Sequence, residues 1–454
     1  MQLLTDLRSI IKDDTRVTAN ETVINNHGQD LTYHQPSNPD LVVFPKTMEE
    51  VQQVVVYAHK NNIPVVPYGA GSSLEGHAIP IKGGISLDFT EMNKIVEVRP
   101  DDFIVKVEPG VTRRQLNKHL KRYGLFFPVD PGADASMGGM AATNASGTNT
   151  VKYGAMRQNV LGLEVVLADG KIIRTGGMSF KTSAGYDLKD LFVGSEGTLG
   201  VFTEITLKLT GIPEVIQAGK AVFKTVEEAS QAAENILKAG IRVARMELVD
   251  EKTIEAVNKF SDTDYIESPS LFLEFDGSKA AVEEDIRFTK EIIDEAGCVT
   301  FQFETDEKAR NLLWHARHEA ALSVVNLVPG KRLTSSDVCV PISELSQAIS
   351  DTRRLVDTYH FQAAAVFGHV GDGNFHVLIG IDPNDAEEVA AYKDLNRKIV
   401  AYALERGGTC TGEHGIGMGK REFLRMEHGA AVDVMGSIKR ALDPENILNP
   451  GKIF

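Results

Sequence analysis

The segment Tyr68-Gly69-Ala70-Gly71-Ser72-Ser73-Leu74-Glu75-Gly76-His77 follows the apolar run Ile63-Pro64-Val65-Val66-Pro67, which is typical of a short buried strand. A loop so rich in glycine and serine lets several backbone N–H groups converge on an anion such as a pyrophosphate. Taken alone, the loop fits an ordinary Gly–Ser turn better than a binding site. It becomes informative together with two further glycine-rich tracts.

The second tract spans residues 129–148, and the third is Gly194-Ser195-Glu196-Gly197-Thr198-Leu199-Gly200. Segments with so few large side chains cannot build a core by themselves, but their backbone can lie against a flat ligand. Three such loops between residues 68 and 200 therefore point to one large cofactor that many turns surround.

Two common nucleotide-binding motifs do not fit these loops. In the dinucleotide fingerprint G-x-G-x-x-G the third glycine comes earlier than Gly76, which disfavours a nicotinamide Rossmann domain. A Walker A motif has Ser or Thr after Gly-Lys, but Gly419-Lys420 is followed by Arg421, which disfavours a P-loop NTPase.

The bulk properties are those of an ordinary globular protein. The chain has 454 residues, 42% of them apolar and 24% charged, and is too long for one simple core. A net charge of −15 argues against nucleic acid as the main partner. Cys298, Cys339 and Cys410 are odd in number and lack CxxC spacing, so we expect free thiols in a reducing compartment.

The sequence shows no targeting segment and no apolar run near the roughly 20 residues that span a bilayer. We therefore expect a cytoplasmic protein, with peripheral contact to the inner face of the membrane left open.

After Gly211-Ile212-Pro213 the glycine-rich tracts end, and segments typical of strands alternate with segments typical of helices. We divide the chain into a first domain over 1–211, a second, α+β domain over 212–410, and a C-terminal segment over 411–454. The turn Asn449-Pro450-Gly451 would let this last segment pack back onto the first domain.

The segment His369-Val370-Gly371-Asp372-Gly373-Asn374-Phe375-His376 has strand-type residues on both sides of a turn-forming centre. A hairpin with its turn at 371–374 would place His369 opposite His376, close enough to share a metal ion. Glu413 would add an anionic ligand and leave coordination positions open, as in catalytic sites. The alternative is a pair of partly buried histidines beside a turn.

With these stretches in order, the chain resembles the FAD-dependent D-lactate dehydrogenases of the vanillyl-alcohol-oxidase-like flavoprotein superfamily, from about Asp40 to the C-terminus. Each motif is weak alone, but the four together in this order are specific. They are Val129-Asp130-Pro131-Gly132-Ala133-Asp134-Ala135-Ser136, Leu191-Phe192-Val193-Gly194-Ser195-Glu196-Gly197-Thr198-Leu199-Gly200, residues 368–376, and Thr409-Cys410-Thr411-Gly412-Glu413-His414-Gly415-Ile416-Gly417.

The resemblance implies an α+β fold. It consists of an FAD-binding domain of the p-cresol methylhydroxylase (PCMH) type, with two α/β subdomains, and an α+β cap domain with an antiparallel sheet. The loop 68–77 would bind the pyrophosphate, and the other two tracts would line the rest of the FAD. The residues expected to contact FAD are Tyr68, Gly69, Ala70, Gly71, Ser72, Ser73, Gly76, His77, Pro131, Gly132, Ser136, Gly138, Gly139, Asn144, Ser146, Gly147, Glu196, Gly197, Val201 and Asn449.

The resemblance also implies that His369, His376 and Glu413 bind a divalent metal. Two imidazoles and a carboxylate suit Zn²⁺, and Mn²⁺ or Fe²⁺ would also serve. His77 stands where relatives carry glycine, so a covalent link between His77 and FAD is an option, although simple contact is favoured.

The implied reaction is the oxidation of a D-2-hydroxy acid to the 2-oxo acid, with hydride transfer to flavin N5. The metal would polarise the substrate hydroxyl, and His414 is the candidate base because histidine titrates near the operating pH. The alternative for His414 is a structural histidine beside the metal. Arg317 fits the substrate carboxylate by resemblance, although the sequence alone suggests a solvated helix residue; Ser335 is a further candidate for substrate contact.

One departure bears on specificity. Relatives acting on D-2-hydroxyglutarate carry a lysine shortly before an Asp-x-x-x-Pro segment, whereas Thr334-Ser335-Ser336 precedes Asp337-Val338-Cys339-Val340-Pro341 here. We therefore expect a monocarboxylate substrate, D-lactate or a longer aliphatic analogue.

Other functions remain open at this stage. The flavin subunit of glycolate oxidase shares the superfamily and the chemistry but depends on partner subunits. A zinc hydrolase built on His-His-Glu and a non-catalytic flavin-binding module are the alternatives from other classes. Quinone, cytochrome, an electron-transfer flavoprotein or oxygen could each be the electron acceptor, and a homodimer is only the general expectation.

Overall fold

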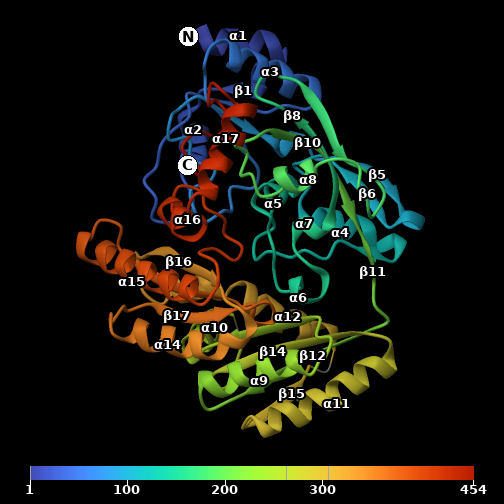
Figure 1. The fold of residues 1–454 in the computed structure, drawn as a ribbon, viewed down its shortest axis with the longest axis vertical. Coiled ribbons are helices and arrows are strands. Elements are labelled where there is room, and N and C mark those ends of the chain that lie inside the picture. Colours follow the sequence, from blue (N-terminus) through green and yellow to red (C-terminus); the bar gives the residue numbers. More distant parts are fainter. Residues whose placement is uncertain (1, 262, 305) are drawn as a thin grey trace. The chain divides into compact units, whose positions relative to one another are not determined.

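The computed structural model describes residues 2–261, 263–304 and 306–454, and the chain forms two compact units (Figure 1). The first unit comprises Met1–Ser146, Ala155–Ile212 and Glu413–Phe454, and the second comprises Gly147–Gly154 and Pro213–Gly412. The short stretch Gly147–Gly154 thus groups with the second unit, although the sequence-based division placed it in the first domain. Both units combine helices with an antiparallel sheet, and the first unit has a smaller, mainly parallel sheet as well, so the predicted α+β class is confirmed.

One sheet of the first unit has the strand order β1-β2-β4-β3 and is parallel except for its edge strand β1. Its strands and helices are β1 (Val17–Thr18), β2 (Leu41–Val43), β3 (Val65–Tyr68), β4 (Ile85–Asp88), α1 (Gln2–Ile11), α2 (Glu21–His27) and α3 (Met48–Lys60). Helix α3 begins after Thr47, whose side chain accepts a hydrogen bond from the backbone N–H of Glu50, and its Val51, Val54 and Val55 are fully buried. The loop 69–77 leaves the sheet where β3 ends.

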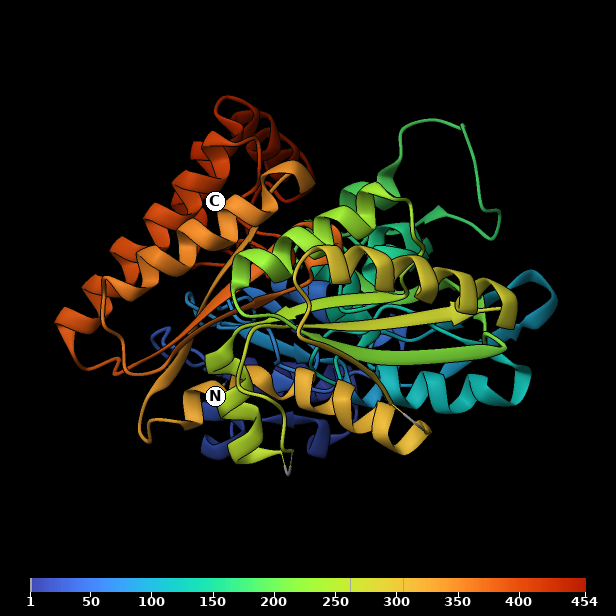
Figure 2. The same ribbon diagram turned by 90° about the horizontal axis from the view of Figure 1, so that it is seen from below.

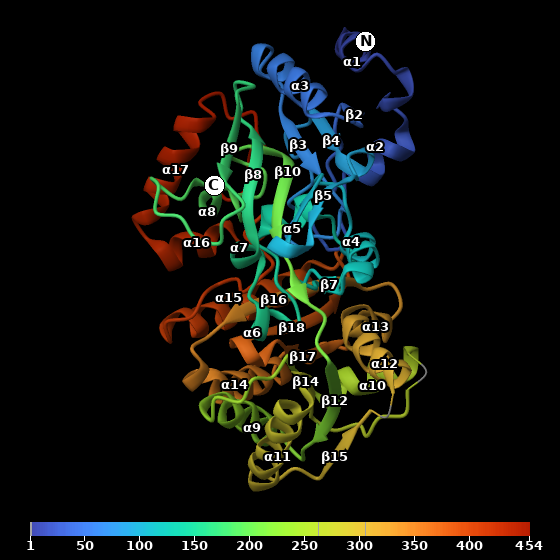
Figure 3. The same ribbon diagram turned by 90° about the vertical axis from the view of Figure 1, so that its right-hand side faces the viewer.

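The other large sheet of the first unit is antiparallel, in the order β5-β6-β10-β8-β9. Figure 3 shows β8, β9 and β10 side by side. The strands are β5 (Ile95–Arg99), β6 (Ile104–Val107), β8 (Val160–Val166), β9 (Ile172–Gly176) and β10 (Val201–Lys208), and β7 (Leu125–Phe126) pairs with β11 (Thr210–Gly211). The accompanying helices are α4 (Arg113–Leu120), α5 (Met137–Thr143), α7 (Met156–Asn159) and α8 (Leu188–Phe192).

The C-terminal segment belongs to the first unit through specific contacts. After α16 (Arg421–His428) and α17 (Ala431–Leu442), Leu448 forms a parallel bridge with Val65 of β3. Ile447 and Leu448 are buried in the core of the parallel sheet. The ammonium group of Lys439 donates hydrogen bonds to the carbonyls of Thr198 (2.8 Å) and Leu448 (2.9 Å), and it pairs with Asp443.

The second unit is built on a seven-stranded antiparallel sheet in the order β15-β12-β14-β13-β17-β18-β16. The strands are β12 (Val215–Val222), β13 (Arg245–Val249), β14 (Ser270–Gly277), β15 (Thr300–Phe303), β16 (Arg332–Cys339), β17 (Ala364–Gly368) and β18 (Asn374–Ile381). The four strands β13, β17, β18 and β16 are neighbours, and they carry the polar residues described below.

Helices flank this sheet. One group is α9 (Val226–Lys238), α11 (Lys279–Glu295), α14 (Leu345–Asp357) and α15 (Ala386–Glu405), in which α9 contacts both α11 and α14, and α14 contacts α15. The other elements are α6 (Thr150–Tyr153), α10 (Glu251–Phe260), α12 (Glu307–His318) and α13 (Ala320–Asn326). Figure 2 shows α9 and α11 on one side of the strands and α10, α12 and α13 on the other. No helix in the described part of the chain is long and apolar enough to cross a membrane.

The predicted histidine hairpin is confirmed as β17 and β18, but its predicted register is wrong. Phe367, not His369, lies opposite His376. The backbone N–H of Asp372 donates to the carbonyl of His369 (3.0 Å), so the connection already turns at Val370–Asp372 and is longer than the expected four residues. His369 therefore lies just beyond the end of β17, with its ring centroid 5.3 Å from that of His376.

We expect the substitution Lys439→Met to destabilise the first unit strongly. It would leave the buried carboxylate of Asp443 and two buried carbonyls without their cation, at a cost of about 3 kcal/mol. The melting temperature should fall by roughly 6–12 °C for a unit of this size. The matched control is Lys118→Met on the exposed side of α4, which should leave the melting temperature unchanged; equal melting temperatures for both variants would contradict the role of Lys439.

Candidate active site

The loop after β3 exposes an unusual run of backbone donors. Among the described residues, none accepts a hydrogen bond from the backbone N–H groups of residues 69–75, whereas Gly76 donates to the carboxylate of Asp30 (3.0 Å). Backbone donors without an internal partner require water or a ligand. A run of such donors suits the oxygen atoms of a pyrophosphate, as the sequence predicted.

The three glycine-rich tracts meet in the first unit. A Cβ atom on Gly69 would collide with the side-chain oxygen of Ser136, so glycine is required where the first tract crosses the start of α5. The third tract bonds to the end of α5, because Gly194 and Glu196 donate their backbone N–H groups to the carbonyls of Ala141 (2.9 Å) and Ala142 (2.8 Å). These contacts bring the backbones of all three tracts close together, which is the arrangement that the binding of one large ligand requires.

Glu196 connects these tracts to the C-terminal segment. Its carboxylate accepts hydrogen bonds from the backbone N–H groups of Ile416 (2.7 Å) and Gly417 (2.8 Å), and it lies 3.4 Å from Nε2 of His77. Burial lowers the pKa of His77, but the charge and hydrogen bond of Glu196, together with the charge of Glu75, outweigh burial and leave that pKa raised. The side-chain amide of Asn449 donates to the carbonyls of His77 (3.0 Å) and Glu196 (2.7 Å).

These observations bear on the predicted FAD contacts. The accessible backbone donors and small side chains of the three tracts fit a long dinucleotide cofactor. The side chains of Glu196 and Asn449, in contrast, form hydrogen bonds to backbone groups and thereby connect the first and third tracts with the C-terminal segment. The hydroxyl of Ser146 donates to Oε2 of Glu413 (2.5 Å), so the second tract also touches the segment that carries the predicted metal ligand.

In the second unit, strand register places the predicted metal ligands on one face of the sheet. Phe367 lies opposite His376, and His376 lies opposite Asp337. Val249 lies opposite Phe367, so Glu247, two residues earlier, faces the position of His369. Directly opposed residues share a face, and residues two apart along a strand do as well. Glu247, His376 and Asp337 therefore form a polar row, with His369 at its edge.

Glu247 is the most connected residue of this row. It is fully buried, and its Oε1 accepts a hydrogen bond from Nδ1 of His369 (2.7 Å). Its Oε2 accepts from Nε of Arg317 (2.8 Å) and pairs with Nη2 of the same guanidinium (2.6 Å). Burial raises the pKa of Glu247, but the charges of Arg317 and His369 and their hydrogen bonds together outweigh burial and leave the pKa below its usual value. A carboxylate paired with a guanidinium acts as an acceptor, so the contact with Nδ1 of His369 is one in which the imidazole donates.

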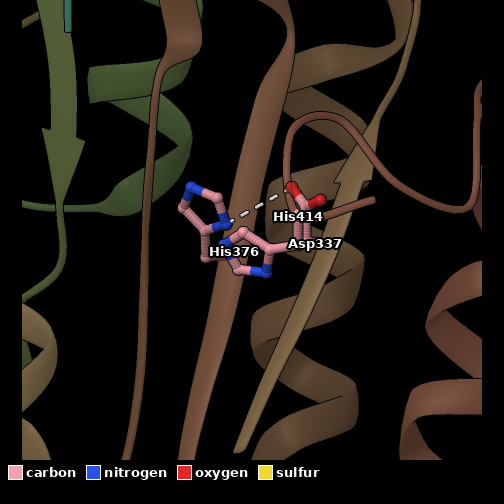
Figure 4. A group of neighbouring side chains, drawn as sticks. All are labelled: Asp337, His376 and His414. Atoms are coloured by element: carbon pink, nitrogen blue, oxygen red, sulfur yellow. Dashed lines mark ion pairs between the residues drawn. The ribbon is translucent and has the colours of Figure 1, made fainter. Parts of the chain in front are cut away.

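His376 is backed by a second buried carboxylate (Figure 4). Its Nδ1 lies 3.5 Å from Oδ1 of Asp337, and Asp337 also accepts hydrogen bonds from the amide of Asn374 (2.7 Å) and the hydroxyl of Thr411 (2.8 Å). Ligand nitrogens of His369 and His376 lie within 4.8 Å of each other. Two imidazoles at this separation, one hydrogen-bonded to a carboxylate and the other lying beside one, have the arrangement of metal-ligating histidines.

The chain reaches Glu413 and His414 directly from this row. Gly412 is packed so tightly that a Cβ atom there would collide with the side-chain amide of Asn374. Successive Cα atoms are about 3.8 Å apart, so the backbone of the next two residues starts from this point. Within the described part of the second unit, His376 offers a ligand atom within 4.8 Å of ligand atoms of both His369 and Asp337, whereas Glu413 and His414 follow Gly412 in the chain and belong to the first unit.

The other predicted site residues lie in the same unit. Arg317 is buried at the end of α12 and is no solvated helix residue; its guanidinium also stacks on the ring of Phe367, 4.3 Å from the centroid. Ser335 lies on β16 two residues before Asp337 and therefore on the same face.

Sequence reasoning gave no role to Glu247 or Asp337. The available signal was a carboxylate within an otherwise apolar strand pattern, as in Arg245-Met246-Glu247-Leu248-Val249.

Comparisons with known proteins agree with this architecture. The family model FAD linked oxidases, C-terminal domain, matches residues 212–453, more than half of the chain, and the FAD binding domain model matches residues 39–176. A Danio rerio protein named probable D-lactate dehydrogenase, mitochondrial, is 46% identical, with 100% of this chain and 92% of that protein covered. The glycolate oxidase subunit GlcD of Bacillus subtilis is 35% identical, with 94% and 92% covered.

A solved structure supports the fold. The crystal structure of p-cresol methylhydroxylase with substrate bound matches with a TM-score of 0.79 at 17% identity, covering 100% of this chain and 96% of that chain. The predicted PCMH-type fold is thereby confirmed, and the family match argues against the zinc-hydrolase alternative. The chain belongs to the family of FAD-linked oxidases to which D-lactate dehydrogenases also belong.

Proposed function

We propose that the protein uses FAD to oxidise a D-2-hydroxy monocarboxylate, D-lactate foremost, to the 2-oxo acid. The observation that carries this proposal is the polar row of the second unit, where a buried arginine and two carboxylate-backed histidines lie together. A small 2-hydroxy acid offers a carboxylate for the arginine and an adjacent hydroxyl for a metal. The 46% identity to a protein named as a D-lactate dehydrogenase favours D-lactate over glycolate.

His369, His376 and Glu413 are the proposed ligands of one divalent metal ion. Two imidazoles and one carboxylate suit Zn²⁺, Mn²⁺ or Fe²⁺ and leave coordination positions open for substrate. Glu247 and Asp337 hold the two imidazoles in orientation.

The FAD site is assigned to the three glycine-rich tracts of the first unit. The backbone N–H groups of residues 69–75 bind the pyrophosphate, and the tracts 129–148 and 194–201 line the remainder. Glu196 and Asn449 act by fixing the loops.

The reaction divides among few residues. When bound, FAD accepts the hydride that leaves C2, and the metal ion draws electron density from the substrate hydroxyl. Arg317 binds the substrate carboxylate through its planar guanidinium. His414, adjacent in the chain to the metal ligand Glu413, takes the hydroxyl proton, so the substrate loses one hydride and one proton and becomes the 2-oxo acid.

The first test is the visible spectrum of the purified protein under anaerobic conditions. We expect flavin bands that bleach with D-lactate and persist with L-lactate. Removal of divalent metal by a chelator should slow the bleaching, and Zn²⁺ or Mn²⁺ should restore it. Flavin that neither isomer bleaches, with glycolate as the effective reductant instead, would favour the glycolate oxidase alternative.

Replacement of the proposed base should reduce turnover without loss of cofactor. For His414→Gln we expect kcat to fall about 100- to 10,000-fold, the usual contribution of a positioned base. The FAD content, read from the flavin absorbance, should equal that of the wild type. The control is His428→Gln at the exposed end of α16, which should keep full activity. A kcat within a few-fold of the wild type would leave His414 as a structural residue.

Substrate selection follows from the residues before Asp337. Thr334 and Ser336 donate their hydroxyls to Ile379 (2.8 Å) and Asn396 (2.6 Å), and no lysine is present in this segment to bind a second carboxylate. We therefore expect kcat/KM for D-lactate to exceed that for D-2-hydroxyglutarate by at least tenfold, measured by dye reduction. The opposite ratio would show that another cation receives the second carboxylate.

A further inference from the structure

Glu247 links the proposed metal site to the proposed carboxylate site. We propose that it is a positioning residue that sets both the orientation of the metal ligand His369 and that of the substrate-binding Arg317. This inference rests on the proposed function and assigns a role to a residue that touches neither metal nor substrate.

The two oxygens of Glu247 have separate partners. Oε1 accepts from His369, and Oε2 accepts from Arg317, at 2.7 and 2.8 Å. The carboxylate is rigid and fully buried on the central part of the sheet, so water does not substitute for either partner. Any rotation of this one group therefore moves both His369 and Arg317.

The contact with His369 fixes which ring nitrogen can bind a metal. The carboxylate of Glu247 pairs with the guanidinium of Arg317 and acts as an acceptor, so Nδ1 of His369 donates and Nε2 presents its lone pair. His369 lies just beyond the end of β17, where its carbonyl accepts hydrogen bonds from the backbone N–H groups of Asp372 (3.0 Å) and Asn374 (3.3 Å), and Glu247 adds a contact to its ring. Loss of such a supporting carboxylate typically weakens metal binding about 10- to 100-fold.

The contact with Arg317 leaves a defined edge of the guanidinium for a ligand. Glu247 engages Nε and Nη2, and the guanidinium plane lies over the ring of Phe367. Among the described residues none accepts a hydrogen bond from Nη1. Glu247 thus neutralises part of the buried charge and holds the group flat, while Nη1 remains available to a substrate oxygen.

The neighbouring strand supplies a matched control. Glu274 on β14 lies opposite Arg245 and is also buried. It pairs with an arginine, Arg245 (3.4 Å), and accepts a hydrogen bond from Nε1 of Trp314 (2.6 Å). Glu274 therefore matches Glu247 in burial and in having two partners, but neither of its partners is a proposed site residue.

The experiment compares Glu247→Gln with Glu274→Gln in the full-length flavoprotein. Each protein is stripped with a chelator and titrated with Mn²⁺, and KM and kcat for D-lactate are then measured at saturating metal. For Glu247→Gln we expect Mn²⁺ affinity to fall about 10- to 100-fold and KM for D-lactate to rise about tenfold or more. FAD content should stay at the wild-type level. Glu274→Gln should leave Mn²⁺ affinity and KM at wild-type values.

Two outcomes would overturn the inference. One is wild-type Mn²⁺ affinity and KM in Glu247→Gln. The other is an equal loss in Glu274→Gln, which would mean that any buried carboxylate of this face has the same effect. If Glu247→Gln does not fold, Glu247→Asp keeps the charge but is one methylene too short to reach both partners; wild-type behaviour of Glu247→Asp would likewise overturn the inference.

The Mn²⁺ titration also separates this inference from the proposed function. If D-lactate fails to bleach the wild-type flavin, the substrate assignment fails, yet the loss of Mn²⁺ affinity in Glu247→Gln still tests the positioning of His369. A wild-type protein that binds no Mn²⁺ and no Zn²⁺ would overturn the role of Glu247 toward a metal together with the proposed metal site.

Discussion

Buried carboxylates need compensating partners, and the second unit depends on this constraint. Glu247 and Asp337 are both fully buried on one sheet face, where an unpaired charge would be very unfavourable. Glu247 is compensated by Arg317 and His369, and Asp337 by Asn374, Thr411 and His376. Because Arg317, His369 and His376 are among these partners, several of the contacts that compensate the buried carboxylates are also contacts of the proposed substrate and metal ligands.

In the first unit, buried polar side chains also need partners, and their contacts fix the glycine-rich tracts. Its glycine-rich tracts have few side chains that could pack, so polar clamps fix them instead. Glu196 is held between His77 and the backbone of residues 416–417, and Asn449 joins two tracts through their carbonyls. Clamping from the side leaves the backbone N–H groups of residues 69–75 accessible, which packing of large side chains over the same loop would prevent.

Composition and motif order were enough to predict the class of fold, the glycine-rich tracts and the histidine hairpin, because these depend on local chemistry. The register of the hairpin was not predictable: Gly371 and Gly373 both suggest a turn, and only the packed structure shows that it begins at His369. Glu247 was missed for a related reason. An alternating strand normally turns its charged face to water, and the burial of this face becomes visible only when α12 brings Arg317 onto it.

The two histidines of the row differ in how they are held. His376 lies within β18, where backbone pairing on both sides with β17 and β16 already fixes its position, and its carboxylate neighbour Asp337 is 3.5 Å away. His369 lies in the connection after β17, and its carboxylate contact is much shorter, at 2.7 Å. A side chain on a loop has more freedom to lose than one on a central strand. The shorter carboxylate contact therefore belongs to the histidine outside the strands, and the proposed metal site at this sheet face would depend on Glu247 for the orientation of the His369 ring.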